Sequence, residues 1–161
     1  MKYFILFLMY SSTLFACIDG KEFYTSTNMK LVCDKTYPVL KFALKDPRGV
    51  VWGIVYSDDM AAVEMNWDDA KAYCEQHGLK LPSNTEWDYM HLVFGHPDNC
   101  WGPNPQGPCY RPGNIIPSFH ENAFWSRSKI FGRDPHYFWR GSAAGNVDLS
   151  SNLYGVMCIS I

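Results

Sequence analysis

Long runs of one charge are missing from this sequence. Its 161 residues carry 14 Lys and Arg against 16 Asp and Glu, which gives a formal net charge of −2. Proteins that bind nucleic acid usually gather lysine and arginine in a basic stripe, and the sequence has none. We therefore expect no nucleic-acid partner.

Apolar runs long enough to cross a membrane are also missing. Lys2 precedes an uncharged, mostly apolar stretch, Tyr3–Phe15, and Ala16 places a small residue at a cleavage point. This pattern is typical of an export signal, and it is shorter than the roughly 20 apolar residues that span a bilayer. We predict a signal peptide at residues 1–16 and no integral membrane span.

Histidine is sparse and shows no spacing typical of metal ligands. Cys74 and His77 stand three residues apart, but a cysteine on a helix of an exported protein is more often in a disulfide than in a zinc site. We expect His77 to interact with the end of a helix dipole instead. The sequence therefore predicts no metal site. The other four histidines are His91, His96, His120 and His136.

Cysteine, in contrast, is well represented. Six cysteines in an exported chain suggest three disulfides, provided that Cys17 keeps its thiol. The stretch Leu14-Phe15-Ala16-Cys17 resembles a bacterial lipobox, although Phe15 is bulky for its place in that motif. Cys17 is therefore either disulfide-bonded or lipidated. Secreted, periplasmic and outer-membrane-associated locations all stay open.

The first third of the chain is typical of short strands. Residues 17–45 alternate apolar and polar side chains, and we interpret them as an N-terminal strand or hairpin extension before a domain at 46–161. Asp46-Pro47-Arg48-Gly49 predicts a turn, and Val50–Tyr56 predicts a strand.

Two helices follow, each with a start signal. Asn66 is placed to cap the first helix, which Gly78 ends. Ser83 and Glu86 form a capping box at the start of the second helix. Trp87 and Met90 then lie at helical spacing with Phe94 and predict the buried face.

The last third combines a long loop with strands. Residues 97–117 are rich in Pro, Gly and Asn, and an ordered loop of this length is often functional. Three later segments read as strands of one small antiparallel sheet: residues 123–126, 136–141 and 154–159. The whole pattern predicts an α+β fold with two helices packed on small antiparallel sheets.

The segment Trp67–Cys74, then Gly78–Ser83 and Glu86-Trp87, resembles the two-helix region of the formylglycine-generating-enzyme (sulfatase-modifying factor) superfamily. Phe124–Ser128 and Val156–Ile159 are similar to the closing strands of secreted bacterial lectin-like domains in that superfamily. The resemblance covers roughly residues 50–161 and implies the C-type-lectin-like fold.

This fold joins its first helix to its last strand, so the resemblance implies a Cys74–Cys158 disulfide. Cys100–Cys109 would then close the long loop, and Cys17–Cys33 would close an N-terminal hairpin. Six cysteines allow fifteen pairings, so the argument depends on the first bond alone.

The resemblance also bears on catalysis. The enzymes of the superfamily capture copper with a late cysteine pair, whereas the late region here holds only Cys158. Calcium-dependent lectins of this fold use Glu-Pro-Asn or Gln-Pro-Asp with a later Trp-Asn-Asp, and none of these tripeptides occurs. We expect no enzyme activity and no cofactor, although calcium stays an option for the fold.

Aromatic and arginine side chains gather in and after the long loop. Such side chains dominate binding hot spots, so they predict a loop face that binds a cell-surface or extracellular glycan or protein. The alternative to a binding role is a core position for Trp125 and Trp139. For Arg127 and Arg140 the alternative is an ordinary solvated charge. The predicted binding residues are Trp101, Tyr110, Arg111, His120, Trp125, Arg127, His136 and Arg140.

Two hypotheses of different classes follow, with a third behind them. The first is an exported, non-catalytic binding or adhesion module. The second is a structural envelope protein anchored by lipid at Cys17. A metal oxidase of the formylglycine-generating type is the third.

Overall fold

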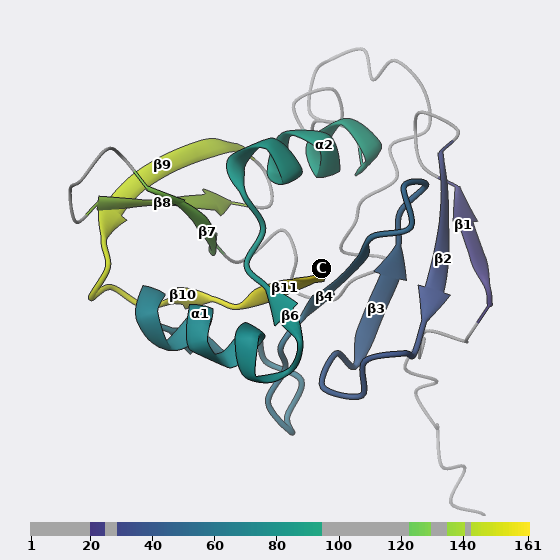
Figure 1. Cartoon of the computed structure of the whole chain (residues 1–161), viewed down its shortest axis with the longest axis horizontal. Helices are drawn as coiled ribbons and strands as arrows, with labels where there is room; N and C mark the ends of the chain where they lie inside the picture. The colour runs from purple at the N-terminus through teal and green to yellow at the C-terminus, as the bar shows by residue number, and fades with distance from the viewer. Residues whose placement is uncertain (1–19, 25–28, 95–122, 130–134, 141–142) are drawn as a thin grey trace, which may run out of the picture.

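A computed structural model describes five stretches of the chain: residues 20–24, 29–94, 123–129, 135–140 and 143–161 (Figure 1). Within them the chain forms two helices and two sheets, which is the α+β class predicted from the sequence. Neither of these helices has the length and apolar character needed to cross a membrane.

The larger sheet has six strands in the order β1-β2-β3-β4-β11-β6, and all its pairs are antiparallel. Strand β3, which belongs to the predicted N-terminal extension, pairs directly with β4, so both parts share one sheet. The strands are β1 (Glu22–Tyr24), β2 (Lys30–Asp34), β3 (Phe42–Lys45), β4 (Val51–Ile54), β6 (Leu79–Lys80) and β11 (Met157–Ser160).

The smaller sheet has five strands in the order β5-β10-β7-β8-β9. Its pairs are antiparallel except for β10 and β7, which are parallel where Gly155 pairs with Phe124. The strands are β5 (Glu64–Met65), β7 (Ala123–Lys129), β8 (Pro135–Arg140), β9 (Ala143–Leu149) and β10 (Tyr154–Gly155).

The closing strands correct one detail of the sequence analysis, which predicts that 154–159 is one strand of the same small sheet as 123–126. Instead, β10 belongs to the smaller sheet, whereas β11 lies between β4 and β6 of the larger one. The chain changes sheet around Val156, whose backbone N–H donates to the carbonyl of Val63 and whose carbonyl accepts from Val55. The last strand thus joins the two sheets.

Helix α1 (Trp67–Gln76) begins and ends where the sequence predicted. The Asn66 side chain accepts a hydrogen bond from the backbone N–H of Asp69 at 2.9 Å, as an N-cap does. His77 follows as the C-cap, and Gly78 adopts a φ of 69°, which suits a residue without a Cβ. His77 Nδ1 lies 2.8 Å from the Tyr73 carbonyl, so the imidazole caps the end of the helix.

Helix α2 (Asn84–Phe94) starts with the predicted capping box. The Ser83 backbone N–H donates to Glu86 Oε2 at 2.6 Å, and the Glu86 N–H donates to Ser83 Oγ at 3.3 Å. Trp87 and Met90 are fully buried, so the predicted inward face is confirmed at both residues. Phe94 ends the helix.

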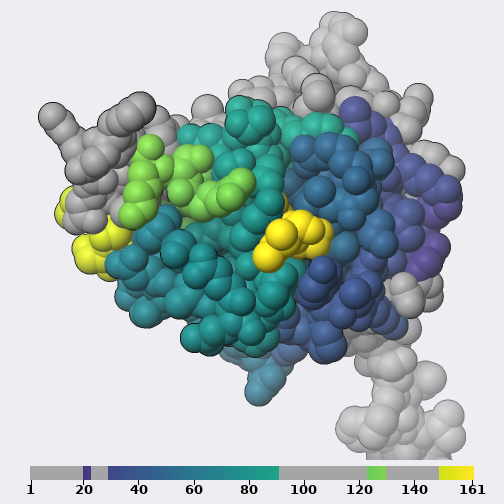
Figure 2. All heavy atoms as spheres, viewed as in Figure 1, coloured from purple at the N-terminus to yellow at the C-terminus, as the bar shows by residue number. Residues whose placement is uncertain are grey.

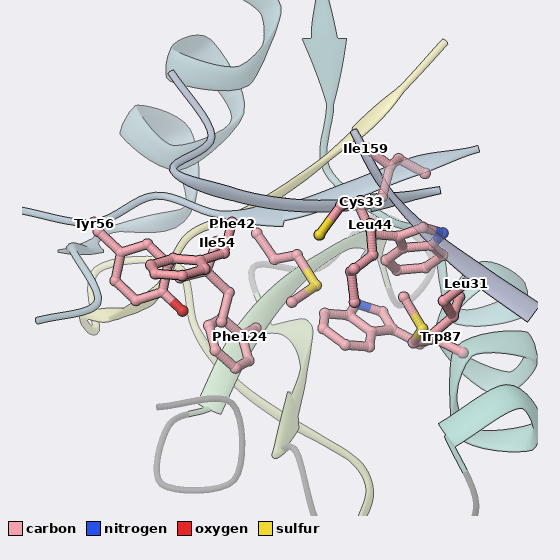
Figure 3. Packing of buried hydrophobic residues seen from close by; sticks show 12 residues of the cluster. Leu31, Cys33, Phe42, Leu44, Ile54, Tyr56, Trp87, Phe124 and Ile159 are labelled. Carbon is pink, nitrogen blue, oxygen red and sulfur yellow. The ribbon is translucent and has the colours of Figure 1, made fainter. Parts of the chain in front are cut away.

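The larger sheet separates two hydrophobic clusters, because neighbouring residues of a strand point to opposite faces. The α2 cluster contains Trp87 and Met90, and Figure 3 shows its side chains packed between the sheet, α2 and β7. The α1 cluster contains Trp67, Ala70 and Cys74. Strand β11 contributes to both: Met157 and Ile159 enter the α2 cluster, whereas Val156 and Cys158 enter the α1 cluster.

The structure contains the Cys74–Cys158 disulfide implied by the resemblance. It joins α1 to β11 across 84 residues of sequence, and both cysteines are fully buried. Cys33 is also disulfide-bonded, while its predicted partner Cys17 lies outside the described residues. The predicted pair Cys100 and Cys109 lies outside them as well.

Candidate functional site

The predicted binding residues fall into three groups in the structure. Trp125 and Arg127 lie on β7 with their side chains described. His136 and Arg140 lie on β8, where the backbone registers place them opposite Lys129 and Ala123. Four lie outside the described residues: Trp101, Tyr110, Arg111 and His120.

Trp125 is a core residue in this structure. Its side chain is fully buried in the α1 cluster, and its indole Nε1 donates a hydrogen bond to the Met65 carbonyl at 2.8 Å. The Tyr154 ring meets it edge-on at 4.8 Å between centroids. The indole is therefore not accessible to a ligand in this arrangement, which favours the core interpretation of this tryptophan.

Arg127 lies two residues further along β7, and its side chain is 46% exposed. Its backbone N–H donates to the Pro82 carbonyl at 2.8 Å, which fixes the strand beside the start of α2. The pairing of β7 with β8 shifts register between Trp125 and Lys129. This irregularity accompanies the change from the buried Trp125 to the exposed Arg127.

Glu86 links Arg127 to the larger sheet. Its carboxylate lies 3.2 Å from Lys80 Nζ and 3.5 Å from Arg127 Nη2, and the side chain is 16% exposed. Burial alone would raise the pKa of Glu86, but hydrogen bonds from Ser83 and the hydrogen bond and charge of Lys80 outweigh it, so the pKa is lowered. Glu86 therefore stays ionised and holds two cations beside the helix start.

Trp67 forms a second link between cations. Its Nε1 donates to the Ser126 carbonyl at 2.8 Å, which ties α1 to β7. Lys129 Nζ lies 4.3 Å from the centroid of the Trp67 ring, within the range of a cation–π contact. Lys71 Nζ lies 6.0 Å from the same centroid and also pairs with Glu75 at 3.2 Å.

These contacts define a basic face that consists of Lys71, Lys80, Arg127 and Lys129. Figure 2 shows the residues of β7 at the surface beside those of the helical region. Within the described part of the chain, Glu75 and Glu86 are the carboxylates that form ion pairs with these cations, and Lys129 pairs with neither. The face can therefore offer hydrogen-bond donors and positive charge to a ligand.

Sequence reasoning identified Arg127 but missed the three lysines. Arg127 and Lys129 stand at i and i+2 on a strand, a spacing that places two side chains on one face, and this signal could have paired them. Lys80 and Lys71 had no comparable signal, because the two cations of β7 that share this face lie more than 40 residues away in sequence.

A second charged group, the buried Asp46 carboxylate, has a structural role. Its Oδ1 accepts from the backbone N–H groups of Arg48 and Val50, and its Oδ2 accepts from the Arg48 guanidinium and Trp52 Nε1. The same guanidinium lies 3.4 Å from the centroid of the Tyr89 ring on α2. Asp46 thus closes the β3–β4 turn and connects it to α2.

Chemistry based on thiols or metals has few candidates among the described residues. Cys158 is bonded to Cys74, so its sulfur is not an available nucleophile. Within the ranges given above, no three His, Cys, Asp or Glu side chains are grouped so that they could hold a metal ion.

Comparison with known proteins agrees with part of the resemblance seen in the sequence. Residues 18–95, just under half of the chain, match the family model described as a sulfatase-modifying factor enzyme 1-like domain. The match includes the N-terminal strands, which the motif-based resemblance left out, and it ends at the close of α2.

Two curated proteins with related names are similar over a shorter stretch. Inactive C-alpha-formylglycine-generating enzyme 2 of Mus musculus is 36% identical over 52 residues, which are 32% of this chain and 17% of the mouse protein. The Bos taurus protein of the same name is 35% identical over 52 residues, again 17% of its length. No solved structure matches the chain significantly. Residues 18–95 are therefore similar to the sulfatase-modifying-factor family.

Proposed function

We propose that this chain is an exported, non-catalytic binding module of the formylglycine-generating-enzyme-like superfamily, with the C-type-lectin-like fold. It recognises an extracellular or cell-surface glycan or protein through the face that β7 shares with the starts of α1 and α2. The other predicted binding residues, Trp101, Tyr110, Arg111 and His120, lie outside the described residues.

The state of Cys158 carries the non-catalytic part of the proposal. Oxidases of the resembled family need a reactive late cysteine pair, and the single late cysteine here is buried in a disulfide with Cys74. The relatives that match are themselves named inactive, which supports the same conclusion over the stretch they share.

The binding part rests on the contrast between Trp125 and Arg127. Trp125 is locked in the core by its hydrogen bond to Met65, whereas Arg127 presents a half-exposed guanidinium on a backbone fixed by Pro82. Arginine is enriched in binding hot spots because its planar group forms several directed hydrogen bonds. A rigid strand that presents such a side chain is suited to recognition.

The proposal is tested by screening the purified protein on a glycan array and on whole-cell surfaces. We expect saturable binding that Arg127→Ala weakens and that Lys35→Ala leaves unchanged, since Lys35 lies just after β2, at the other end of the molecule from β7 (Figure 1). Oxygen consumption with copper and a cysteine-containing peptide should stay at background. Copper-dependent oxidation of the peptide would refute the non-catalytic assignment, and an absence of saturable binding to any surface would refute the binding role.

A further inference from the structure

We infer that the basic face selects an acidic glycan, one that carries carboxylate or sulfate groups. The inference rests on the proposed binding function and names the chemistry of its ligand. It is carried by the arrangement of four cations that come from separate elements: Lys71 of α1, Lys80 of β6, and Arg127 and Lys129 of β7.

The four cations form a row of two pairs, and each pair is joined by a shared partner. Glu86 contacts both Lys80 and Arg127, and the Trp67 ring contacts both Lys129 and Lys71. Between these pairs, Arg127 and Lys129 lie two positions apart on β7, a step of about 7 Å between Cα atoms in a regular strand. Four cations spread over three elements match an anion with several charged groups better than they match one small anion.

The row is only partly neutralised. Glu86 lies closer to Lys80, at 3.2 Å, than to Arg127, at 3.5 Å, and it also accepts the Ser83 N–H at 2.6 Å. Lys129 contacts an aromatic ring, and no ion pair joins it to a carboxylate in the described part of the chain. Arg127 and Lys129 are therefore the cations with the most capacity for a new anionic partner.

The row is also preorganised by contacts on the strand backbone. The Arg127 N–H donates to Pro82, the Ser126 carbonyl accepts from Trp67, and Ser128 Oγ accepts from the Asn84 N–H at 3.0 Å. These bonds hold β7 between both helices, so little backbone order has to be gained on binding. Half-buried Ser128, between Arg127 and Lys129 on β7, adds a hydroxyl group that sugar hydroxyls can pair with. This mixture of fixed cations and neutral polar groups favours a glycan over a purely acidic peptide.

The experiment measures binding of the full chain to four immobilised probes: heparin as a sulfated glycan, polygalacturonate as a carboxylated glycan, dextran as a neutral glycan, and poly-glutamate as an acidic peptide. We expect binding to at least one acidic glycan, no binding to dextran, and a fall in affinity as salt rises from roughly 50 to 500 mM, since salt screens exposed charges. The probe that binds more tightly, heparin or polygalacturonate, tells whether the face prefers sulfate or carboxylate groups.

Variants then locate the site. Arg127→Gln with Lys129→Gln should weaken binding about tenfold, given up to ~1 kcal/mol for each exposed charge contact. Lys21→Gln with Lys35→Gln removes the same charge at the β1–β2 side and should leave affinity unchanged (Figure 1). Glu86→Gln should tighten binding about threefold, because it removes the competing carboxylate from Lys80 and Arg127. Thermal melts of all variants establish that each is folded.

Several outcomes overturn the inference without touching the proposed function. Equal binding to dextran, or saturable array binding that is insensitive to both salt and the Arg127/Lys129 variant, would leave a binding module with a different ligand. Preferential binding to poly-glutamate would assign the face to an acidic peptide instead. A lack of saturable binding on any array or surface would refute the proposed function itself.

Discussion

The two faces of the larger sheet hold their helices in different ways. On one face, α1 is joined to β11 by the Cys74–Cys158 disulfide, deep in the α1 cluster. On the other, α2 is held by aromatic packing, with Trp87 edge-on to Trp52 at 5.8 Å between ring centroids, and by Arg48 against Tyr89. One helix is thus fixed by a covalent bond and the other by non-covalent contacts. Of the two helices, α1 is therefore the one whose attachment should respond to reduction.

Removal of the disulfide tests the covalent side and should have the largest effect. In the chain-entropy model, a cross-link that closes a loop of this length stabilises the folded state by about 4–5 kcal/mol. We expect Cys74→Ala with Cys158→Ala to lose most of that free energy of unfolding, as measured by urea denaturation. A loss below about 1 kcal/mol would mean that packing alone fixes α1, and the contrast between the two faces would disappear.

Truncation of Met90 tests the packed side. Met90 is fully buried in the α2 cluster, and Met→Ala changes in cores typically cost about 2–5 kcal/mol. We expect Met90→Ala to lower the free energy of unfolding by about 3 kcal/mol under both oxidising and reducing conditions. Asp88→Ala, at an exposed position on the same helix, is the matched control and should change stability by less than about 0.5 kcal/mol. Equal losses in the two variants would show that α2 is not anchored through this face.

The features that the sequence predicted well are local ones. Both helix starts depend on hydrogen bonds between residues three apart, between Asn66 and Asp69 and between Ser83 and Glu86, so the pattern alone contains them. The Asp46–Gly49 turn is equally local, with the Gly49 N–H donating to the Asp46 carbonyl at 2.8 Å. Such contacts need no knowledge of the fold.

The features that the sequence missed depend on long-range pairing. Residues 154–159 alternate as one strand would, but the change of sheet at Val156 depends on contacts with Val55 and Val63, about 100 residues earlier. Strand β9 went unpredicted because Gly145 and Asn146 lie within it, and both residue types are depleted in strands. The sequence predicted the basic face only in part for the same reason. Lys80 and Arg127, which are 47 residues apart in sequence, are brought together by their shared contact with Glu86.

The turn between β3 and β4 offers a smaller test of the packed side. Both oxygens of the Asp46 carboxylate accept hydrogen bonds from N–H donors. In Asp46→Asn one of these oxygens becomes an NH₂ group, which would face N–H donors whichever way the amide is turned. We expect a loss of about 2 kcal/mol in the free energy of unfolding, measured by urea denaturation, which is the usual cost of an unsatisfied buried polar group. Asp58→Asn, on an exposed loop with a 3.5 Å contact to Lys41, should leave stability unchanged. A neutral Asp46→Asn would mean that the turn does not help to hold α2.

Glu86 lies where α2 meets the basic face, and its charge gives the smallest and most specific prediction. We expect Glu86→Gln to cost about 1 kcal/mol at pH 7, because glutamine can keep the capping box but loses the charge that pairs with Lys80 and Arg127. Because the folded-state pKa of Glu86 is lowered from its usual value of 4.5, its ionised form contributes stability above that value and loses it as pH falls through the lowered pKa. The stability difference between wild type and Glu86→Gln should therefore shrink below about pH 4.5, and chemical denaturation across roughly pH 2.5–7 measures it.

The matched control is Glu75→Gln on the exposed side of α1, where the carboxylate forms an i,i+4 pair with Lys71. Such pairs contribute about 0.3–0.5 kcal/mol, so this variant should differ little from wild type at any pH. If the Glu86→Gln difference stayed constant down to about pH 2.5, the carboxylate charge would not be what stabilises the start of α2. Suppose instead that the stability difference shrinks as expected while the same variant binds an acidic glycan more tightly. In that case the Glu86 carboxylate stabilises the fold and weakens the binding of the glycan. At the start of α2, the same charge would then stabilise the helix and weaken the binding of an anion to the basic face.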